Sequence, residues 1–258
     1  MRDHHFAKAR RVLLLAGALS STAPALADEQ ASTLLALFGS SSGRIEGSGK
    51  VIDDVRDITG FSRVILQGPL DVRVKATDAD GVIVHADDNI APLIETHVLG
   101  GTLVIGVRAG SSYRTQTKVQ VRVQARKLQG VVLRGSGDVR VDRVDAEVFE
   151  ATLQGSGDIV VDSLRASAVA VSIAGKGDVR IKGTAGSLGV VLDGSGDVWC
   201  ADLPAKQVAV RIRGKGDVRV HATDELKVDV DGSGDVHYRG TPKITKSIRG
   251  SGSVKPLR

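Results

Sequence analysis

One five-residue motif dominates this sequence and limits what the chain can fold into. GSGDV stands at 135–139, and close variants follow at 155–159, 175–179, 194–198, 214–218, 232–236 and 250–254. The first glycines of successive motifs are 18 to 20 residues apart. A fixed period of this length is typical of a solenoid, in which each repeat forms one turn that packs only on its neighbours.

Hydrophobic residues alternate with polar or small residues on both sides of the motif. Two residues before the first glycine stand Leu133, Leu153, Ile173, Leu192, Ile212, Val230 and Ile248. Directly after the aspartate stand Val139, Ile159, Val179, Val198, Val218 and Val236. A period of two indicates strands with one buried face. The repeat therefore predicts an all-β, parallel β-helix-like solenoid with ~20-residue turns, stacked about 4.8 Å apart.

The motif itself is predicted to be a corner between two strands. We expect its glycines to adopt backbone angles that a side chain would forbid. We expect its aspartate to accept hydrogen bonds from nearby backbone N–H groups, as in an Asx-turn. In the last repeat Ser253 replaces the aspartate, and Lys255 and Pro256 follow. Lysine and proline discourage further strand pairing, so the solenoid is expected to end there.

The first 27 residues are typical of a secretory signal peptide. A basic start is followed by the short apolar run VLLLAGAL at 12–19 and by Ala25-Leu26-Ala27. We therefore expect an exported protein, periplasmic or extracellular, cleaved near Ala27. Residues 28–49 are predicted to be a flexible leader. Residues 50–258 are predicted to be one β-helix domain, with an irregular first half at 50–130 and regular GxGD repeats at 131–258.

Charge and cysteine usage exclude several function classes. The formal net charge is +5, but residues 1–27 carry +3 of it, so the remainder is too weakly basic for bulk nucleic-acid binding. No later segment is long and apolar enough for a transmembrane helix. Cys200, the only cysteine, occupies a slot that holds valine or isoleucine in other repeats, which predicts a buried apolar substitute rather than a nucleophile.

The sequence also resembles a known family. The serial GSGDV motifs, FSRVILQGPLDVRV at 61–74 and DDNIAPLIETHVLGGTLVI at 87–105 are similar to the putative auto-transporter adhesin head GIN domain family. The resemblance covers roughly residues 50–258. It implies a right-handed β-helix-like fold on an exported bacterial protein, and it implies no catalytic or ligand residues.

The recurring aspartates are the main candidates for chemistry, since stacked carboxylates repel unless they are compensated. We expect compensation by cations on the same side, namely Arg140, Arg180, Arg219, Lys176 and Lys215. A calcium ladder is an alternative, although calcium repeats of this kind use a nine-residue period. A retaining glycosidase pair is another, but a carboxylate on nearly every turn lacks the local uniqueness of a catalytic site. We therefore expect no catalytic residue, cofactor or metal.

The outward cations and the only tryptophan are predicted to form a shallow contact surface. Its residues are Arg140, Arg180, Arg219, Trp199, Lys176 and Lys215. The leading hypothesis is a non-enzymatic, adhesin-like domain that presents a repetitive surface to an unknown protein or glycan partner at the cell envelope. The alternative is a carbohydrate-active protein that binds or cleaves acidic polysaccharide. The sequence leaves the oligomeric state open.

Overall fold

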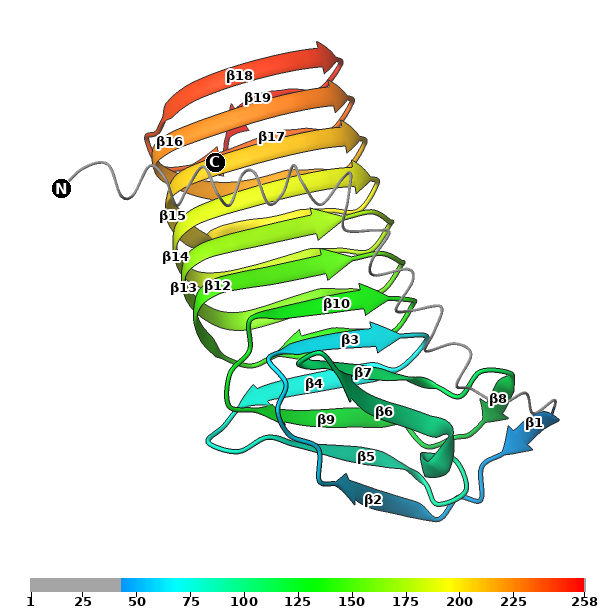
Figure 1. Cartoon of the computed structure of the whole chain (residues 1–258). Coiled ribbons are helices and arrows are strands. Elements are labelled where there is room, and N and C mark those ends of the chain that lie inside the picture. The colour runs from blue at the N-terminus through cyan, green and yellow to red at the C-terminus, as the bar shows by residue number, and fades with distance from the viewer. Residues whose placement is uncertain (1–42, 258) are drawn as a thin grey trace.

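The computed structural model describes residues 43–257, and these form a parallel β-solenoid, as predicted (Figure 1). The predicted signal peptide and residues 28–42 of the predicted leader lie outside the described residues. Residues 43–46, which we expected to belong to the leader, form strand β1. The fold is therefore an all-β solenoid with one short 3₁₀ turn.

The regular half of the solenoid is built from strands that wrap around it. Each of the longest strands, of 15 to 17 residues, runs from one GxGD corner almost to the next. The strands are β10 (Gly130–Arg134), β11 (Val139–Val141), β12 (Val144–Leu153), β13 (Ile159–Ile173), β14 (Val179–Gly194), β15 (Val198–Gly214), β16 (Val218–Gly232), β17 (Val236–Arg239), β18 (Lys243–Gly250) and β19 (Val254–Pro256).

Two faces of the solenoid meet at the corners. The upstream face consists of the strand segments directly before each corner, and the downstream face consists of those directly after it. Pairing within both faces is parallel and in register, so that Leu192 lies beside Ile212 on one face and Val198 beside Val218 on the other. We call each turn of the solenoid a rung. Equivalent residues of successive rungs therefore form straight columns.

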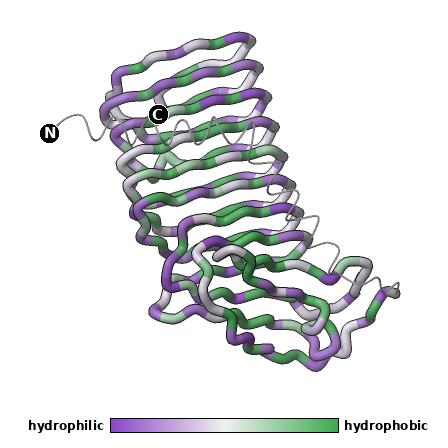
Figure 2. The backbone as a smooth tube through the Cα atoms, in the orientation of Figure 1, coloured by the Kyte–Doolittle hydropathy of each residue, from purple (hydrophilic) through white to green (hydrophobic). Residues whose placement is uncertain are grey.

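The core fills the space between the faces, and the predicted inward columns are confirmed except in the last repeat, where Ile248 is only partly buried. Leu133, Leu153, Ile173, Leu192, Ile212 and Val230 are all buried. So are the residues that follow each corner, Val139, Ile159, Val179, Val198, Val218 and Val236. Figure 2 shows the alternation of hydrophobic and hydrophilic residues repeated along successive rungs. One continuous hydrophobic core thus runs along the axis, which no single repeat could bury alone.

The backbone angles that we expected of the corner glycines are confirmed at some of the first glycines, and the second glycines have a role that we did not predict. Four of the first glycines, Gly135, Gly214, Gly232 and Gly250, have a positive φ, at 156°, 145°, 144° and 120°, whereas none of the second glycines does. What the second glycines share is a close approach between rungs. A Cβ built on Gly196 would lie 2.0 Å from the carbonyl oxygen of Gly177, and one on Gly216 would lie 1.8 Å from that of Gly196. The motif needs glycine because backbone stacks directly on backbone.

The first half of the chain forms the base of the solenoid. Its strands are β1 (Gly43–Glu46), β2 (Val51–Arg56), β3 (Arg63–Gln67), β4 (Asp71–Ala76), β5 (Gly81–Asp87), β6 (Ile94–Leu99), β7 (Thr102–Val107), β8 (Ser111–Arg114) and β9 (Gln120–Ala125), with the 3₁₀ turn η1 (Ala91–Leu93) before β6. Strands β3 and β4 flank the first corner and continue the two faces through β10 and β11.

Antiparallel strands close this base. On the upstream face β7 pairs with β3 in parallel, and β6 then pairs with β7 antiparallel. On the downstream face β9 pairs with β4 in parallel, and β5 and then β2 add antiparallel pairs. Figure 1 places this base at one end of the molecule and β18 at the other. The two ends of the solenoid therefore differ in structure.

Candidate functional site

The aspartates of the corners form a column in which each carboxylate is bonded to the next rung. Asp138 Oδ1 accepts a hydrogen bond from the backbone N–H of Asp158 at 2.9 Å. In the next pair, Asp158 Oδ1 accepts a hydrogen bond from the backbone N–H of Asp178 at the same distance. The same bond continues through Asp178, Asp197, Asp217 and Asp235. The expected N–H acceptor role is confirmed, but its partner lies one turn ahead instead of within the same corner.

The end of this column explains the exception in the last repeat. Ser253 donates both its backbone N–H and its hydroxyl to Asp235 Oδ1, each at 2.7 Å. The hydroxyl lowers the pKa of Asp235 from its usual range, because it stabilises the charged form. Ser253 thus ends the column among the described residues as a donor to Asp235.

The column does not rely on the five cations that we expected to compensate it. Arg219 alone among them approaches ladder carboxylates, at 4.0 Å from Asp197 and 3.7 Å from Asp217. Arg140 instead makes a bidentate pair with Asp162, at 2.8 and 2.9 Å. Arg180, Lys176 and Lys215 form no ion pair with any described residue. The negative charges are stabilised chiefly by backbone N–H groups, a form of hydrogen bonding that favours the ionised carboxylate.

The predicted contact residues on the downstream face do come together in one outward column. In register order this column reads Arg73, Arg140, Val160, Arg180, Trp199, Arg219, His237 and Lys255. Lys176 and Lys215 lie at the corners instead, and the Ser195 corner stands between them. The column is cationic along most of its length, while the neighbouring aspartate column is anionic.

Trp199 is part of this stack rather than a free platform. The Arg219 guanidinium lies 3.8 Å from the ring centroid, and that of Arg180 lies 5.4 Å away. Because Arg180 and Arg219 belong to the rungs on either side, both ring faces are covered. Such cation–π contacts contribute about 0.5–2 kcal/mol each. The indole N–H of Trp199 is buried without a hydrogen-bond partner among the described residues. A sugar could stack on this ring only if an arginine moved.

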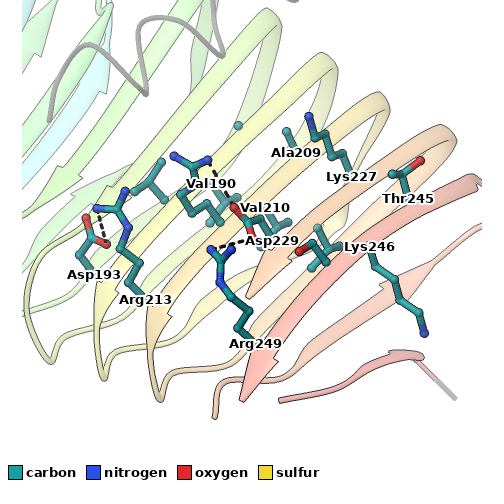
Figure 3. Close-up of a pocket in the computed structure, with 15 residues that line it drawn as sticks. Val190, Asp193, Ala209, Val210, Arg213, Lys227, Asp229, Thr245, Lys246 and Arg249 are labelled. Atoms are coloured by element: carbon teal, nitrogen blue, oxygen red, sulfur yellow. Dashed lines mark ion pairs between the residues drawn. The ribbon is translucent and has the colours of Figure 1, made fainter. Parts of the chain in front are cut away.

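A shallow groove on the upstream face was not predicted (Figure 3). It has a volume of about 380 Å³ and a floor that includes Gly189, Val191 and Ala209. Its rim carries ion pairs, among them Asp193 with Arg213 at 3.8 Å and Asp229 with Arg211 at 3.4 Å. The sequence did contain a signal, since the outward position five residues before the first glycine holds small residues at Ala170, Gly189 and Ala209.

The described residues offer few groups suited to other chemistry. No cluster of three histidine, cysteine or acidic side chains among residues 43–257 could hold a metal ion. Cys200 is fully buried, as predicted, and its burial raises the pKa of the thiol to about 12. Within the same residues no helix is long and apolar enough to cross a membrane.

Comparisons with known proteins agree with this architecture. Residues 60–242 match the family described as putative auto-transporter adhesin, head GIN domain. A putative adhesin from Bacteroides fragilis is similar in structure, with a TM-score of 0.79 and 25% identity over 83% of this chain and all of that one. A putative adhesin from Parabacteroides distasonis gives 0.69 at 24% identity over 83% of this chain and all of that one.

A third solved structure carries a different description. It is a putative lipid binding protein from Parabacteroides distasonis, with a TM-score of 0.69 and 25% identity over 84% of this chain and all of that one. A search of curated proteins found no match. The solved structures thus share the solenoid over most of this chain.

Proposed function

The chain belongs to the putative auto-transporter adhesin head GIN domain family, and on that basis we propose that it is an exported, non-enzymatic, adhesin-like scaffold. In this proposal the solenoid presents its lateral faces to a protein or glycan partner at the cell envelope. Similar solved structures, such as the one from Bacteroides fragilis, are also described as putative adhesins.

One observation carries the non-enzymatic part of the proposal, namely the use of the aspartate column for backbone bonding. A catalytic acid or nucleophile needs an environment that sets it apart from chemically identical neighbours. Asp158, Asp178 and Asp197 instead share one environment, in which each Oδ1 accepts the N–H of the next rung at 2.8–2.9 Å. These carboxylates serve the scaffold, and the outward columns are left for contact.

A second candidate is the binding of acidic polysaccharide along the downstream face. It is favoured by Lys176, Arg180 and Lys215, which have no ion-pair partner among the described residues and project from one side of the solenoid. Repeating cations at the rung spacing suit a repeating polyanion. The covered ring of Trp199 argues against strong sugar stacking.

Export is proposed from the signal-peptide pattern at 1–27. Fractionation of cells that express the full gene tests it. The protein should appear in the periplasm, on the surface or in the medium, with an N-terminus near Asp28. A cytoplasmic protein that retains Met1 would contradict the proposal.

The adhesin-like proposal is tested by incubating the purified protein with a glycan array, with envelope extract and with uronic-acid polymers. We expect binding without release of reducing ends. Cleavage that is abolished by one Asp→Asn change in the ladder would overturn the non-enzymatic proposal. If a uronic-acid polymer binds, Arg180→Glu should weaken binding at least tenfold, whereas Arg165→Glu, another exposed arginine, should not.

A further inference from the structure

The two ends of the solenoid leave strand edges unpaired. Among the described residues β18 pairs only with β16, and β19 pairs only with β17. At the base β2 pairs only with β5, and β6 pairs only with β7. An unpaired edge presents free N–H and C=O groups and can be extended by another strand. Each end thus has one open edge on each face (Figure 1).

Exposed hydrophobic side chains gather at these edges. Six large hydrophobic side chains are exposed among the described residues, and five of them lie on the terminal strands: Val51 and Val55 on β2, Val98 and Leu99 on β6, and Ile244 on β18. The sixth, Val148, lies on β12 in the middle of the solenoid. Clustered apolar exposure at the ends, with almost none on the sides, is typical of a contact surface.

The two ends carry opposite charge. Strands β18 and β19 contain Lys243, Lys246, Arg249 and Lys255 and no acidic residue. At the base, β2 contains Asp53 and Asp54, and Asp57 follows it. Asp53 is paired with His85 and Arg122, and Asp54 with Arg56. Asp57 has no ion pair with any described residue. Like charges therefore oppose pairing of two identical ends, whereas the basic end and the acidic base attract one another.

The strand directions allow the ends to continue one another. On the downstream face every pairing from β19 down to β9 is parallel, and the two antiparallel steps through β5 bring β2 back to the direction of β19. On the upstream face the single antiparallel step at β6 makes it antiparallel to β18. Both orientations are ordinary sheet pairings.

We propose that the basic end of one molecule docks on the acidic base of a second copy, so that solenoids stack head to tail. The interface joins β18 and β19 of one copy to β6 and β2 of the next. It brings Ile244 of β18 in the first copy beside Val98 and Leu99 of β6 in the second, and β19 beside Val51 and Val55 of β2. Pro256 has no N–H to offer to the free edge of β19, so β18 and the side chains carry most of the contact. This inference is independent of what the lateral faces bind.

A head-to-tail contact uses two different surfaces and leaves one of each free, so it forms open chains of increasing length. The lysines at the basic end then determine which end of a second molecule can bind. They prevent contact between two basic ends and permit contact with the acidic base. Added salt should weaken the contact, because exposed charges are screened.

The test measures mass by light scattering and sedimentation over a concentration series of the purified protein. We expect the mass to rise with concentration and to fall when salt is added. Val55→Arg alters the base and Ile244→Glu alters the basic end. Val55 is 74% exposed and Ile244 36%, so both variants should keep the wild-type melting temperature. Val148→Arg, at a side chain 38% exposed on the lateral surface, is the matched control and should associate like wild type.

Mixing the two variants gives the decisive result. Each alone should be monomeric, because it lacks one of the two surfaces. Together they should form at least a dimer, through the intact basic end of the Val55→Arg protein and the intact base of the Ile244→Glu protein. If either variant fails to fold, Asp57→Lys takes the place of Val55→Arg and Lys243→Glu takes the place of Ile244→Glu, because these changes alter only exposed charges.

Three outcomes would overturn the proposal. The first is a wild-type protein that stays monomeric at every concentration. The second is a pair of variants of which only one becomes monomeric, since that indicates a symmetric contact between identical ends. The third is a loss of association in Val148→Arg equal to that in the end variants.

Discussion

The Oδ1 atom of Asp197 accepts a hydrogen bond from the backbone N–H of Asp217, one rung ahead, at 2.8 Å. Each corner aspartate therefore fixes the position of the following corner. The bond repeats from Asp138 to Ser253, so the column acts as a ladder that sets the register of the stack.

The ladder should depend on an oxygen acceptor more than on negative charge. Asp197→Asn keeps an Oδ1 acceptor for the Asp217 N–H and should cost less than 1 kcal/mol. Asp197→Ala leaves that N–H without its partner and should cost about 1–2 kcal/mol. Urea unfolding measures both. Asp193→Ala, which removes an exposed carboxylate outside the ladder, is the control and should cost about 0–1 kcal/mol.

The corner glycines should be far less tolerant than the residues between them. Gly196→Ala adds a Cβ 2.0 Å from the Gly177 carbonyl oxygen, so the rungs must separate. We expect a loss of about 3 kcal/mol or more, as for overpacked cores. Ser195→Ala, at the exposed neighbouring position, should change stability by about 0.5 kcal/mol or less. Equal melting temperatures for the two variants would show that the rungs do not stack on glycine.

Calcium should have no effect on stability. One oxygen of each ladder carboxylate, Oδ1, already accepts a backbone hydrogen bond, and hard cations need several free oxygen ligands around one point. Thermal melts in calcium and in chelator should give the same midpoint. A rise in melting temperature with calcium would show that the ladder carboxylates bind the ion in addition to the N–H groups.

Cys200 should be inert in the folded protein. Its pKa of about 12 leaves almost no thiolate at neutral pH, and the side chain is fully buried. A thiol reagent should modify it only after unfolding. Cys200→Val should be tolerated, because Val220 and Ile181 fill the equivalent slots of neighbouring rungs. Cys200→Ser places an unsatisfied hydroxyl there and should cost about 1–3 kcal/mol.

Asp87 should make stability depend on acid pH. It is buried in the base and accepts hydrogen bonds from the hydroxyls of Thr115 and Thr117, which lower its pKa. Because the pKa of Asp87 is lower in the folded than in the unfolded protein, its ionised carboxylate stabilises the fold above the unfolded pKa of about 4. This stabilisation is lost as the pH falls through the folded pKa. The difference in melting temperature between wild type and Asp87→Asn should therefore shrink below about pH 4. A difference that is constant from pH 7 to pH 3 would contradict this account.

The sequence by itself determined the repeat, the inward columns and the position of each corner. Leu192 and Ile212 could be assigned to the core because alternation with period two depends only on neighbouring residues. The slot of Cys200 followed in the same way. Alternation is the same in parallel and antiparallel strands, however, so it did not reveal that β2, β5 and β6 close the base with antiparallel pairs.

Only the tertiary structure decided which atoms meet between rungs. The partner of Asp197 lies 20 residues away in Asp217, and the oxygen that excludes a side chain at Gly196 belongs to Gly177. The same holds for Trp199, whose ring is covered by arginines of the two adjacent rungs. A local pattern sets which way a side chain points. Contacts across about 4.8 Å between stacked backbones arise only after the turns have closed and aligned.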